Sequence, residues 1–320
     1  MNQNSFLKYI QQIISEKENL DLKSNAIRLL NGECDGLEGF TLDRFDQHYQ
    51  IQVFQTQAKK QVKWLVEFLQ NHEECLYLIE KDRTSKSGAS LESFEKKIHK
   101  TQGDSKTQVF EGSAKIQVDL EDTVNPGLFL DMRSNRLKVA SFCKDQKVFN
   151  GFSYTCTFGL HARLKGAEWV ANVDISKKIL EKGKRNYHLS GVGEKPDFIQ
   201  MDTLEYMDFC LKKNRKFGVL ILDPPTFSRY KGKKFHVWRD FQTLFEKGLA
   251  LLEQEGHFFF SMNCSEVSQK SFDDKVRELS SKNKVEAKTL WRVKQAQDFS
   301  SSNLTQYSHL VGAFFKIKKL

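Results

Sequence analysis

The chain has few of the features that mark disulfide-rich, metal-binding or membrane proteins. Its 320 residues include only 4 Pro and 6 Cys, and no two cysteines form a C-x-x-C pair. We therefore expect no zinc site, no other metal ion and no disulfide framework, with the cysteines reduced and mostly buried. The first twenty residues are amphipathic and interrupted by charges, which fits neither a signal peptide nor a membrane span. We expect a cytoplasmic protein without membrane association.

Two glycine motifs of nucleotide-binding proteins are also absent. The chain has no G-x-x-x-x-G-K-[ST] P-loop, and residues 148–162, VFNGFSYTCTFGLHA, lack G-x-G-x-x-G. This stretch passes from an apolar run through small residues into a helical pattern, but Cys156 and Thr157 stand where a pyrophosphate-binding loop has glycine. The pattern disfavours a dinucleotide and leaves open either a smaller nucleoside ligand or an ordinary strand-to-helix turn.

The positive charge is concentrated in the second part of the chain. Residues 1–115 hold 16 Lys/Arg against 17 Asp/Glu, whereas residues 116–320 hold 34 against 24. One basic stretch, KKNRKFG at 212–218, fits a solvated surface as well as a binding site. The other, RYKGKKFHVWR at 229–239, interleaves cations with aromatic rings, which favours contact with phosphates and unstacked bases of a nucleic acid.

Two domains are predicted from the change in pattern along the chain. Residues 1–115 contain alternating apolar and polar runs around glycine-rich turns and one helical segment, typical of a small α+β module. Residues 81–108 are polar and charged and predict a loop region. From residue 116 onward, apolar strands alternate with amphipathic segments, which predicts an α/β fold with a doubly wound, largely parallel sheet. The ligand is expected at the carboxyl ends of these strands.

Carboxylates follow three of the predicted strands. Asp174 ends VANVD and is placed to accept hydrogen bonds from ribose hydroxyls, although an N-cap role also fits. Asp202 ends FIQMD and suits an adenine amine, or equally the cap of the next helix. Asp223 begins the Asp-Pro-Pro turn after FGVLIL, where two prolines remove N–H donors and hold the backbone rigid.

The order FLDMRSNR, FNGFSYTCTFGLHA, VDIS, QMD, DPPTFS, RDFQTL and FFFSMN resembles the class I S-adenosylmethionine-dependent methyltransferases of large-subunit ribosomal RNA. The resemblance covers about residues 116–320 and extends into the preceding module. DPPTFS, SMN and QAQDFSSSN are similar to the branch that methylates guanine N7, while FLDxR and FSYT are shared with the cytosine-C5 branch. The chain departs from the family at Cys156 and Thr157, and from its length we expect no PUA domain like that of the cytosine branch.

The resemblance implies a Rossmann-like methyltransferase domain, S-adenosylmethionine as cofactor and ribosomal RNA as partner. The sequence leaves a monomer and a homodimer equally open. The residues that it assigns to the cofactor are Phe129, Arg133, Asn150, Gly151, Ser153, Tyr154, Thr155, Asp174, Ile175, Asp202, Thr203 and Asp223. For Arg133 a structural ion pair is an equal alternative. The residues expected at the reacting base are Asp223, Pro224 and Asn263. Those expected on the RNA are Phe227, Arg229, Lys231, Lys233, Lys234 and Arg239, with Phe227 stacking on a flipped base.

The target base decides which further residues are needed. Guanine N7 has a lone pair and needs no covalent help, whereas cytosine C5 requires a thiolate and a base. Cys264 is the cysteine best placed for that role, although the family register puts the cysteine nearer Met262. Guanine N7 is therefore favoured. A nicotinamide-dependent oxidoreductase and an RNA-binding protein with an inactive methyltransferase fold are the rival interpretations.

Overall fold

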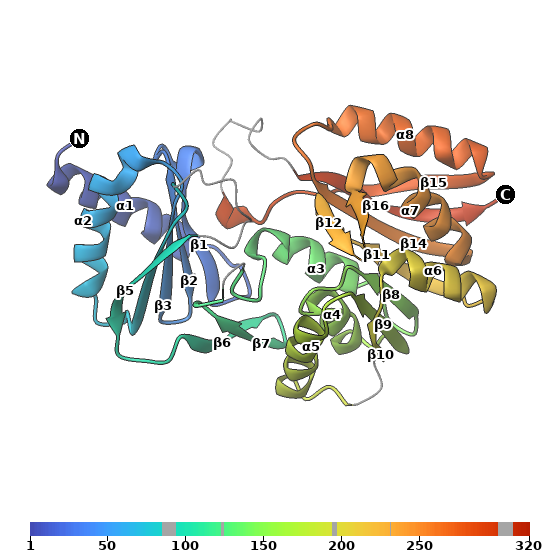
Figure 1. Cartoon of the computed structure of the whole chain (residues 1–320), viewed down its shortest axis with the longest axis horizontal. Helices are drawn as coiled ribbons and strands as arrows, with labels where there is room; N and C mark the ends of the chain where they lie inside the picture. Colours follow the sequence, from blue (N-terminus) through green and yellow to red (C-terminus); the bar gives the residue numbers. More distant parts are fainter. Residues whose placement is uncertain (85–93, 123–124, 194–196, 231, 300–309) are drawn as a thin grey trace. The chain divides into compact units, whose positions relative to one another are not determined.

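The computed structural model describes residues 1–84, 94–122, 125–193, 197–230, 232–299 and 310–320. Contacts divide the chain into two compact units (Figure 1). The first unit comprises Met1–Arg133 together with a segment that begins at Ala296, and the second comprises Ser134–Gln295 together with the last strand. No helix in the described part of the chain is both long and apolar enough to cross a membrane.

The first unit is a five-stranded sheet with two helices on one face and a separate hairpin. The sheet order is β1-β2-β3-β4-β5, in which only β3 and β4 are parallel because α2 connects them. Its elements are α1 (Gln3–Glu18), β1 (Ala26–Asn31), β2 (Phe40–Phe45), β3 (His48–Val53), α2 (Lys59–Gln70), β4 (Tyr77–Asp82), β5 (Glu95–Thr101), β6 (Lys106–Glu111) and β7 (Ala114–Asp119). The predicted small α+β module is what the structure shows here.

Apolar residues at helical spacing hold α1 and α2 against the sheet. Phe6 and Ile10 lie four residues apart on α1 and are fully buried, as are the inward side chains of β2 and β3. The interpretation of 81–108 as loop is wrong in part, because Glu95–Thr101 forms β5. This edge strand has exposed residues at most positions, so it lacks the apolar alternation by which strands are recognised.

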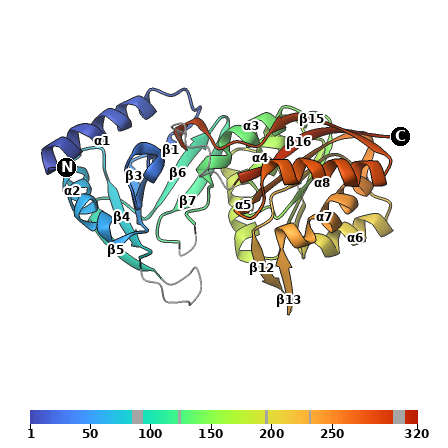
Figure 2. The ribbon, with the colours of Figure 1, turned by 90° about the horizontal axis from the view of Figure 1, so that it is seen from above.

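The second unit is a seven-stranded sheet in the order β10-β9-β8-β11-β14-β16-β15, whose strands are labelled in Figure 1; Figure 2 turns the same view by 90°. The first five of these are parallel, and β16 runs antiparallel to both of its neighbours. Its elements are α3 (Arg133–Ala140), β8 (Lys147–Gly151), α4 (Thr157–Leu164), β9 (Trp169–Asp174), α5 (Lys177–Leu189), β10 (Asp197–Gln200), α6 (Thr203–Lys212), β11 (Phe217–Leu222), β12 (Phe227–Tyr230), β13 (Lys233–His236), α7 (Val237–Leu251), β14 (Leu252–Asn263), α8 (Gln269–Lys282), β15 (Val285–Arg292) and β16 (Leu310–Lys319).

Phenylalanine fills the core of the second unit. β11 is buried at every position, as expected for a central strand of a parallel sheet covered on both faces. Phe241 and Phe245 of α7 pack against Phe258 and Phe260 of β14, while Phe158 of α4 contacts Phe259 on the other face of the sheet. The doubly wound α/β sheet that the strand and helix pattern predicts is confirmed.

The division between the units falls later than the sequence pattern places it. The predicted boundary was 115/116, but the first unit continues to Arg133 and also takes in the chain from Ala296. The hairpin β6–β7 belongs to the first unit because Glu111 bridges to Ser24 and the Phe110 N–H donates to the Asn25 Oδ1. Such long-range contacts leave no mark in the local pattern of residues.

Candidate functional site

The polar ends of four parallel strands lie along one edge of the seven-stranded sheet. From β8 the chain proceeds to β9 and β10 on one side, and then to β11 and β14 on the other. Between β8 and β11 the winding reverses, which is where open α/β sheets bind ligands. We call the residues at this edge the strand-end cluster: the segment 150–156 from the end of β8 into the following loop, Asp174 at the end of β9, Asp202 after β10 and Asp223 after β11.

The loop after β8 has an unusual backbone. Phe152, Tyr154 and Cys156 all have left-handed φ angles, of 54°, 48° and 61°, although none is glycine. Each such residue costs about 1–2 kcal/mol, and the strain persists only where surrounding contacts enforce it. Here the N–H of Phe152 donates to Thr203 Oγ1 at 3.1 Å and that of Ser153 to the Val173 carbonyl at 3.0 Å. Neighbouring strand ends thus hold the loop in place.

Cys156 stands in the loop near the position at which the family commonly has glycine, and its side chain packs against the helix behind the loop. Its side chain is fully buried against Gly183 of α5, where an added Cβ would overlap the Cys156 Sγ. Burial raises the pKa of the Cys156 thiol well above its usual range, so the group is a packing residue rather than a nucleophile. The loop therefore accommodates a cysteine side chain because the facing residue of α5 is glycine.

Asp174 is held by backbone N–H groups at the centre of the cluster. Its Oδ2 accepts from Tyr154 at 3.0 Å and its Oδ1 from Ser176 at 2.9 Å. Burial raises the pKa of this carboxyl, although the N–H groups oppose the shift. The cap of α5 is Ser176, whose hydroxyl accepts from the Ile179 N–H, so Asp174 is not needed as the helix cap.

Asp202 does cap a helix. Its Oδ1 accepts from the Glu205 N–H at 3.1 Å at the start of α6, while its Oδ2 has no partner among the described residues. The half-buried carboxylate therefore keeps one oxygen for a ligand. Thr203, the next residue, is buried, and its hydroxyl accepts from the Phe152 N–H of the loop.

A buried amide chain beneath the cluster was missed in the sequence. Asn150 is 2% exposed, and its Nδ2 donates to Asn172 Oδ1 at 2.9 Å, whose own Nδ2 donates to the Tyr187 hydroxyl at 3.0 Å. The side chain of Asn150 thus joins β8 to β9. Two signals were available: an asparagine within the apolar strand WVANVD, and Gly159 in α4, where a Cβ would overlap Asn172.

The Asp-Pro-Pro turn is clamped by β14. Ser261, fully buried, donates its hydroxyl to Asp223 Oδ1 at 2.5 Å, and the Thr226 hydroxyl donates to the Asn263 carbonyl. Pro224 is buried beside them, and Asn263 is exposed at the strand end. Ser261 was not predicted, because a serine in an apolar strand has no local signature. Cys264 is 2% exposed and Met262 is fully buried.

The other predicted cofactor residues separate into two groups. Within the strand-end cluster, Gly151, Ser153 and Thr155 are buried, whereas Tyr154 and Ile175 are half-buried. Phe129 and Arg133 belong to the first unit. Arg133 is 1% exposed; its Nη1 donates to Asp298 Oδ1 at 2.8 Å and its Nη2 to the Ala26 carbonyl. The structure therefore gives Arg133 the structural ion pair that the sequence left as an alternative.

Four of the predicted RNA-contacting residues, Phe227, Arg229, Lys233 and Lys234, lie on the hairpin β12–β13. β12 and β13 pair so that Arg229 lies opposite Lys234, both exposed, and Phe227 is 68% exposed. Phe235 of β13 contacts Phe152, which joins this basic hairpin to the strand-end cluster. Lys233 lies in β13, Lys231 lies outside the described residues, and Arg239 of α7 bonds the Lys234 carbonyl and Asp240. Among the described residues, no three His, Cys, Asp or Glu side chains meet as metal ligands.

Comparisons with known proteins agree with this architecture. YwbD of Bacillus subtilis (strain 168) is 30% identical over 252 residues, covering 78% of this chain and 63% of YwbD. Ribosomal RNA large subunit methyltransferase I of Aeromonas salmonicida (strain A449) is 29% identical over 251 residues, covering 78% and 63%. The chain thus spans under two thirds of the length of either relative.

Among solved structures, the crystal structure of SMU.776 complexed with SAH has the same fold. It matches with a TM-score of 0.88 at 22% identity, covering 99% of this chain and 82% of that one. The family model described as S-adenosylmethionine-dependent methyltransferase matches residues 100–299, which is more than half of the chain. This chain belongs to the family of S-adenosylmethionine-dependent methyltransferases.

Proposed function

We propose that the chain transfers the methyl group of S-adenosylmethionine to a base of large-subunit ribosomal RNA, at guanine N7. The observation that carries the proposal is the Asp223-Pro224 turn, clamped by Ser261 and followed directly by the exposed Phe227 and the basic hairpin. The relative from Aeromonas salmonicida, named for a large-subunit ribosomal RNA methyltransferase, supports the class of substrate. A cytoplasmic location follows from that substrate and stays a prediction.

The strand-end cluster fits the cofactor. Asp202 Oδ2 has no partner among the described residues, and Asp174, with N–H donors on both oxygens, retains lone pairs for hydroxyl groups. Asp174 would hold the ribose and Asp202 the adenine amine. The loop 150–156 would border the methionine part with a backbone that is already fixed. Three carboxylates along this edge also suit a ligand that carries a positive sulfonium.

The protein's own contribution is mainly alignment and exclusion of water. Bound S-adenosylmethionine supplies a methyl group that is already activated, so the reaction needs the target atom held in line with it. Asp223 and Pro224 would border the target base, with Ser261 fixing the direction of the Asp223 carboxylate. Phe227 offers an exposed ring on which a flipped base can stack. Arg229 and Lys234 would contact the flanking phosphates.

Guanine N7 suits the residues around Asn263 better than cytosine C5. A cytosine-C5 reaction needs a thiolate that reaches the base. Cys264 is buried, and Met262, which carries no thiol, occupies the position nearest the family's cysteine. Guanine N7 attacks with its own lone pair, so the exposed Asn263 amide beside the turn needs only to hydrogen bond the base edge.

The test is to incubate the protein with methyl-labelled S-adenosylmethionine and unmodified large-subunit ribosomal RNA, and to identify the labelled nucleoside by mass spectrometry. Labelled 7-methylguanosine is the expected result, and Asp223→Asn should abolish it while leaving the fold intact. Labelled 5-methylcytidine would overturn the choice of base and make Cys264 the first residue to replace. An unlabelled RNA, despite cofactor binding measured by calorimetry, would overturn the choice of substrate.

A further inference from the structure

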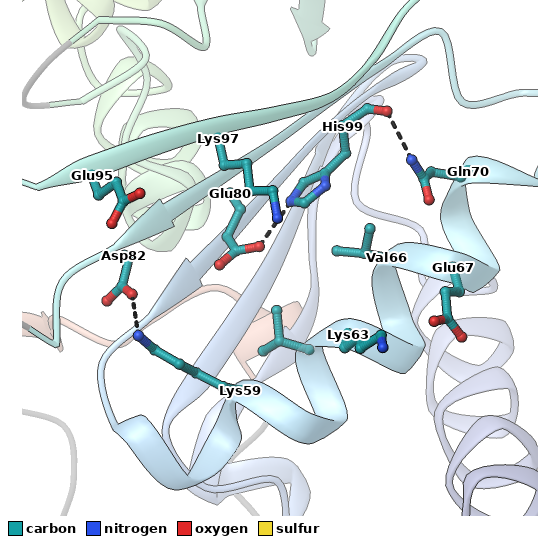
Figure 3. Close-up of a pocket in the computed structure, with 11 residues that line it drawn as sticks. Lys59, Lys63, Val66, Glu67, Gln70, Glu80, Asp82, Glu95, Lys97 and His99 are labelled. Atoms are coloured by element: carbon teal, nitrogen blue, oxygen red, sulfur yellow. Dashed lines mark hydrogen bonds and ion pairs between the residues drawn. The ribbon is translucent and has the colours of Figure 1, made fainter.

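A cavity of the first unit is lined by charged side chains that compensate one another. It measures about 460 Å³ and lies between α2 and the strands β4 and β5 (Figure 3). The Lys59 ammonium lies 2.7 Å from Asp82 Oδ2, and His99 Nε2 lies 2.8 Å from Glu80 Oε2. The lining contains four carboxylates against three lysines, so the cavity has no excess of positive charge that would attract a nucleic acid.

The basic hairpin β12–β13 of the second unit, in contrast, carries cations and exposes one of its two faces. On the inner face, the Phe235 ring lies 5.5 Å from the Phe152 ring, and both rings pack against the core of the second unit. Successive side chains of a strand alternate between faces, so Phe227 and His236, which lie directly opposite each other, share the outer face. This outer face also bears the exposed cation pair of the hairpin.

The rings of Phe227 and His236 meet edge to face. Their centres lie 4.6 Å apart and their planes are inclined by 71°. This arrangement is favourable because the positive edge of one ring meets the negative face of the other. Phe227 is 68% exposed, whereas the His236 side chain is only 18% exposed. An exposed ring thus rests against an enclosed one, which restricts the orientations that Phe227 can take.

His236 is itself fixed by the first turn of α7. The Arg239 N–H donates to His236 Nδ1 at 3.4 Å, which makes His236 the N-cap of this helix. The N–H of His236 donates in return to Asp240 Oδ2 at 2.9 Å. In the neutral imidazole the proton is then on Nε2, which lies 4.0 Å from Glu266 Oε2. The ring that supports Phe227 is therefore held by the helix.

Histidine is an uncommon residue for the cap of a helix. Ser, Thr, Asp and Asn are preferred, because their short side chains place an oxygen close to the N–H groups of the first turn. The helices α5, α6 and α8 of the same unit follow this preference with Ser176, Asp202 and Ser268. At α7 the cap is a ring, and this ring contacts Phe227, which indicates a second role for His236.

We propose that His236 is a positioning residue for the target base, because its ring fixes the orientation of the Phe227 ring on which the flipped base stacks. The inference rests on the proposed function, in which Phe227 contacts the base. A stacking surface that is already oriented loses less side-chain entropy on binding than a freely rotating one. His236 contacts Phe227 and acts through it, so its removal should weaken the binding of RNA and leave the binding of S-adenosylmethionine unchanged.

The test separates the ring of His236 from its role as a helix cap. His236→Asn removes the ring and keeps an acceptor for the Arg239 N–H, whereas His236→Phe keeps a ring and removes the acceptor. The KM for unmodified large-subunit ribosomal RNA should rise by about 2- to 12-fold in His236→Asn, as expected for the loss of one aromatic pair, with unchanged cofactor affinity. His236→Phe should keep a KM near that of the wild type, although the loss of the cap lowers its Tm.

His188→Asn is the matched control, since it removes an exposed imidazole from α5 and should leave the KM unchanged. A wild-type KM in His236→Asn overturns the inference. A KM raised equally in His236→Asn and His236→Phe also overturns it, because the ring is then not what the RNA depends on.

A double-variant cycle shows whether His236 acts through Phe227. Phe227→Ala alone should raise the KM by at least about 5-fold, the effect of losing one base–aromatic stack. His236→Asn should raise it no further in the Phe227→Ala protein, because the contact is already lost; a further rise as large as in the wild-type background overturns the inference. Label transfer by the wild type is scored first. Its absence counts against the proposed function, whereas normal transfer with a wild-type KM in His236→Asn counts against the role of His236 alone.

Discussion

The strand-end cluster and the basic hairpin of the second unit hold their charges in different surroundings. Asp174 is half-buried and accepts N–H groups on both oxygens, so its negative charge is compensated by the backbone. Arg229 and Lys234 lie opposite each other on the hairpin, and both are exposed. We therefore expect ligands of opposite charge at the two places: a cofactor with a sulfonium at the acidic edge and an RNA backbone at the basic hairpin.

The largest effect on cofactor binding is expected from Asp174→Ala, which removes the carboxylate that accepts the Tyr154 and Ser176 N–H groups. We expect loss of S-adenosylmethionine binding, by at least about 100-fold, because a ribose acceptor and the anchor of the Tyr154 N–H disappear together. Calorimetric titration measures this. Asp208→Ala is the matched control, since it removes a half-exposed carboxylate of α6 that pairs with Lys247. Unchanged affinity in Asp174→Ala would contradict the assignment.

Gly183→Ala tests whether the strained loop depends on the helix behind it. Alanine in a helix normally stabilises by up to about 1 kcal/mol, but here the new methyl group overlaps the Cys156 Sγ. We expect a net loss of about 1–3 kcal/mol of unfolding free energy and weaker cofactor binding.

The added change Cys156→Gly should restore both, because it removes the overlapping sulfur at a φ of 61° that glycine tolerates. Gly193→Ala, where an added Cβ meets nothing within 4 Å, is the control. If the Gly183→Ala protein is as stable as the wild type, the loop moves to accommodate the methyl group at no cost, and the prediction is contradicted.

The basic hairpin is expected to contact RNA through its two exposed cations, Arg229 and Lys234. Replacing Arg229 and Lys234 together by Gln should make the salt dependence of RNA affinity shallower by about 1.4, or two phosphate contacts. Replacing Lys212 and Lys213 of the other basic stretch should leave the slope unchanged, since these exposed side chains lie at the end of α6. If the two double variants behave alike, the hairpin has no special role in RNA binding.

The smallest effect concerns pH. Because burial raises the pKa of Asp174, this carboxylate takes up a proton at a higher pH than an exposed aspartate does. Its ionised form accepts the ribose hydroxyls, so cofactor affinity should be constant near neutral pH and fall as the pH drops toward that raised pKa. Calorimetry at successively lower pH should show the affinity begin to fall at a higher pH than the protonation of an exposed aspartate would produce. A curve of the same shape in Asp174→Asn would assign the titration to another group.

The sequence predicts the parallel sheet and the residues at its strand ends because both follow from local patterns. Apolar strands such as FGVLIL and the turns that end them are visible within a few residues. The clamp of Ser261 on Asp223 joins residues far apart in the chain, so no local pattern reveals it. The amide chain from Asn150 to Tyr187 leaves a local trace, the asparagine within WVANVD, but its partners are equally far apart in the sequence. The same holds for the contact between Phe152 and Phe235, which lie far apart in the sequence.

The most direct test of two separate binding surfaces is a pair of titrations, with S-adenosylmethionine and with ribosomal RNA, on the wild type, Asp174→Asn and the double variant Arg229→Gln/Lys234→Gln. We predict that Asp174→Asn binds the cofactor much more weakly and keeps its RNA affinity, whereas the double variant keeps the cofactor and binds RNA with a shallower salt dependence. If Asp174→Asn binds the cofactor as tightly as the wild type does, or if the double variant binds RNA with the wild-type salt dependence, the assignment of opposite ligands to the strand-end cluster and the basic hairpin is contradicted.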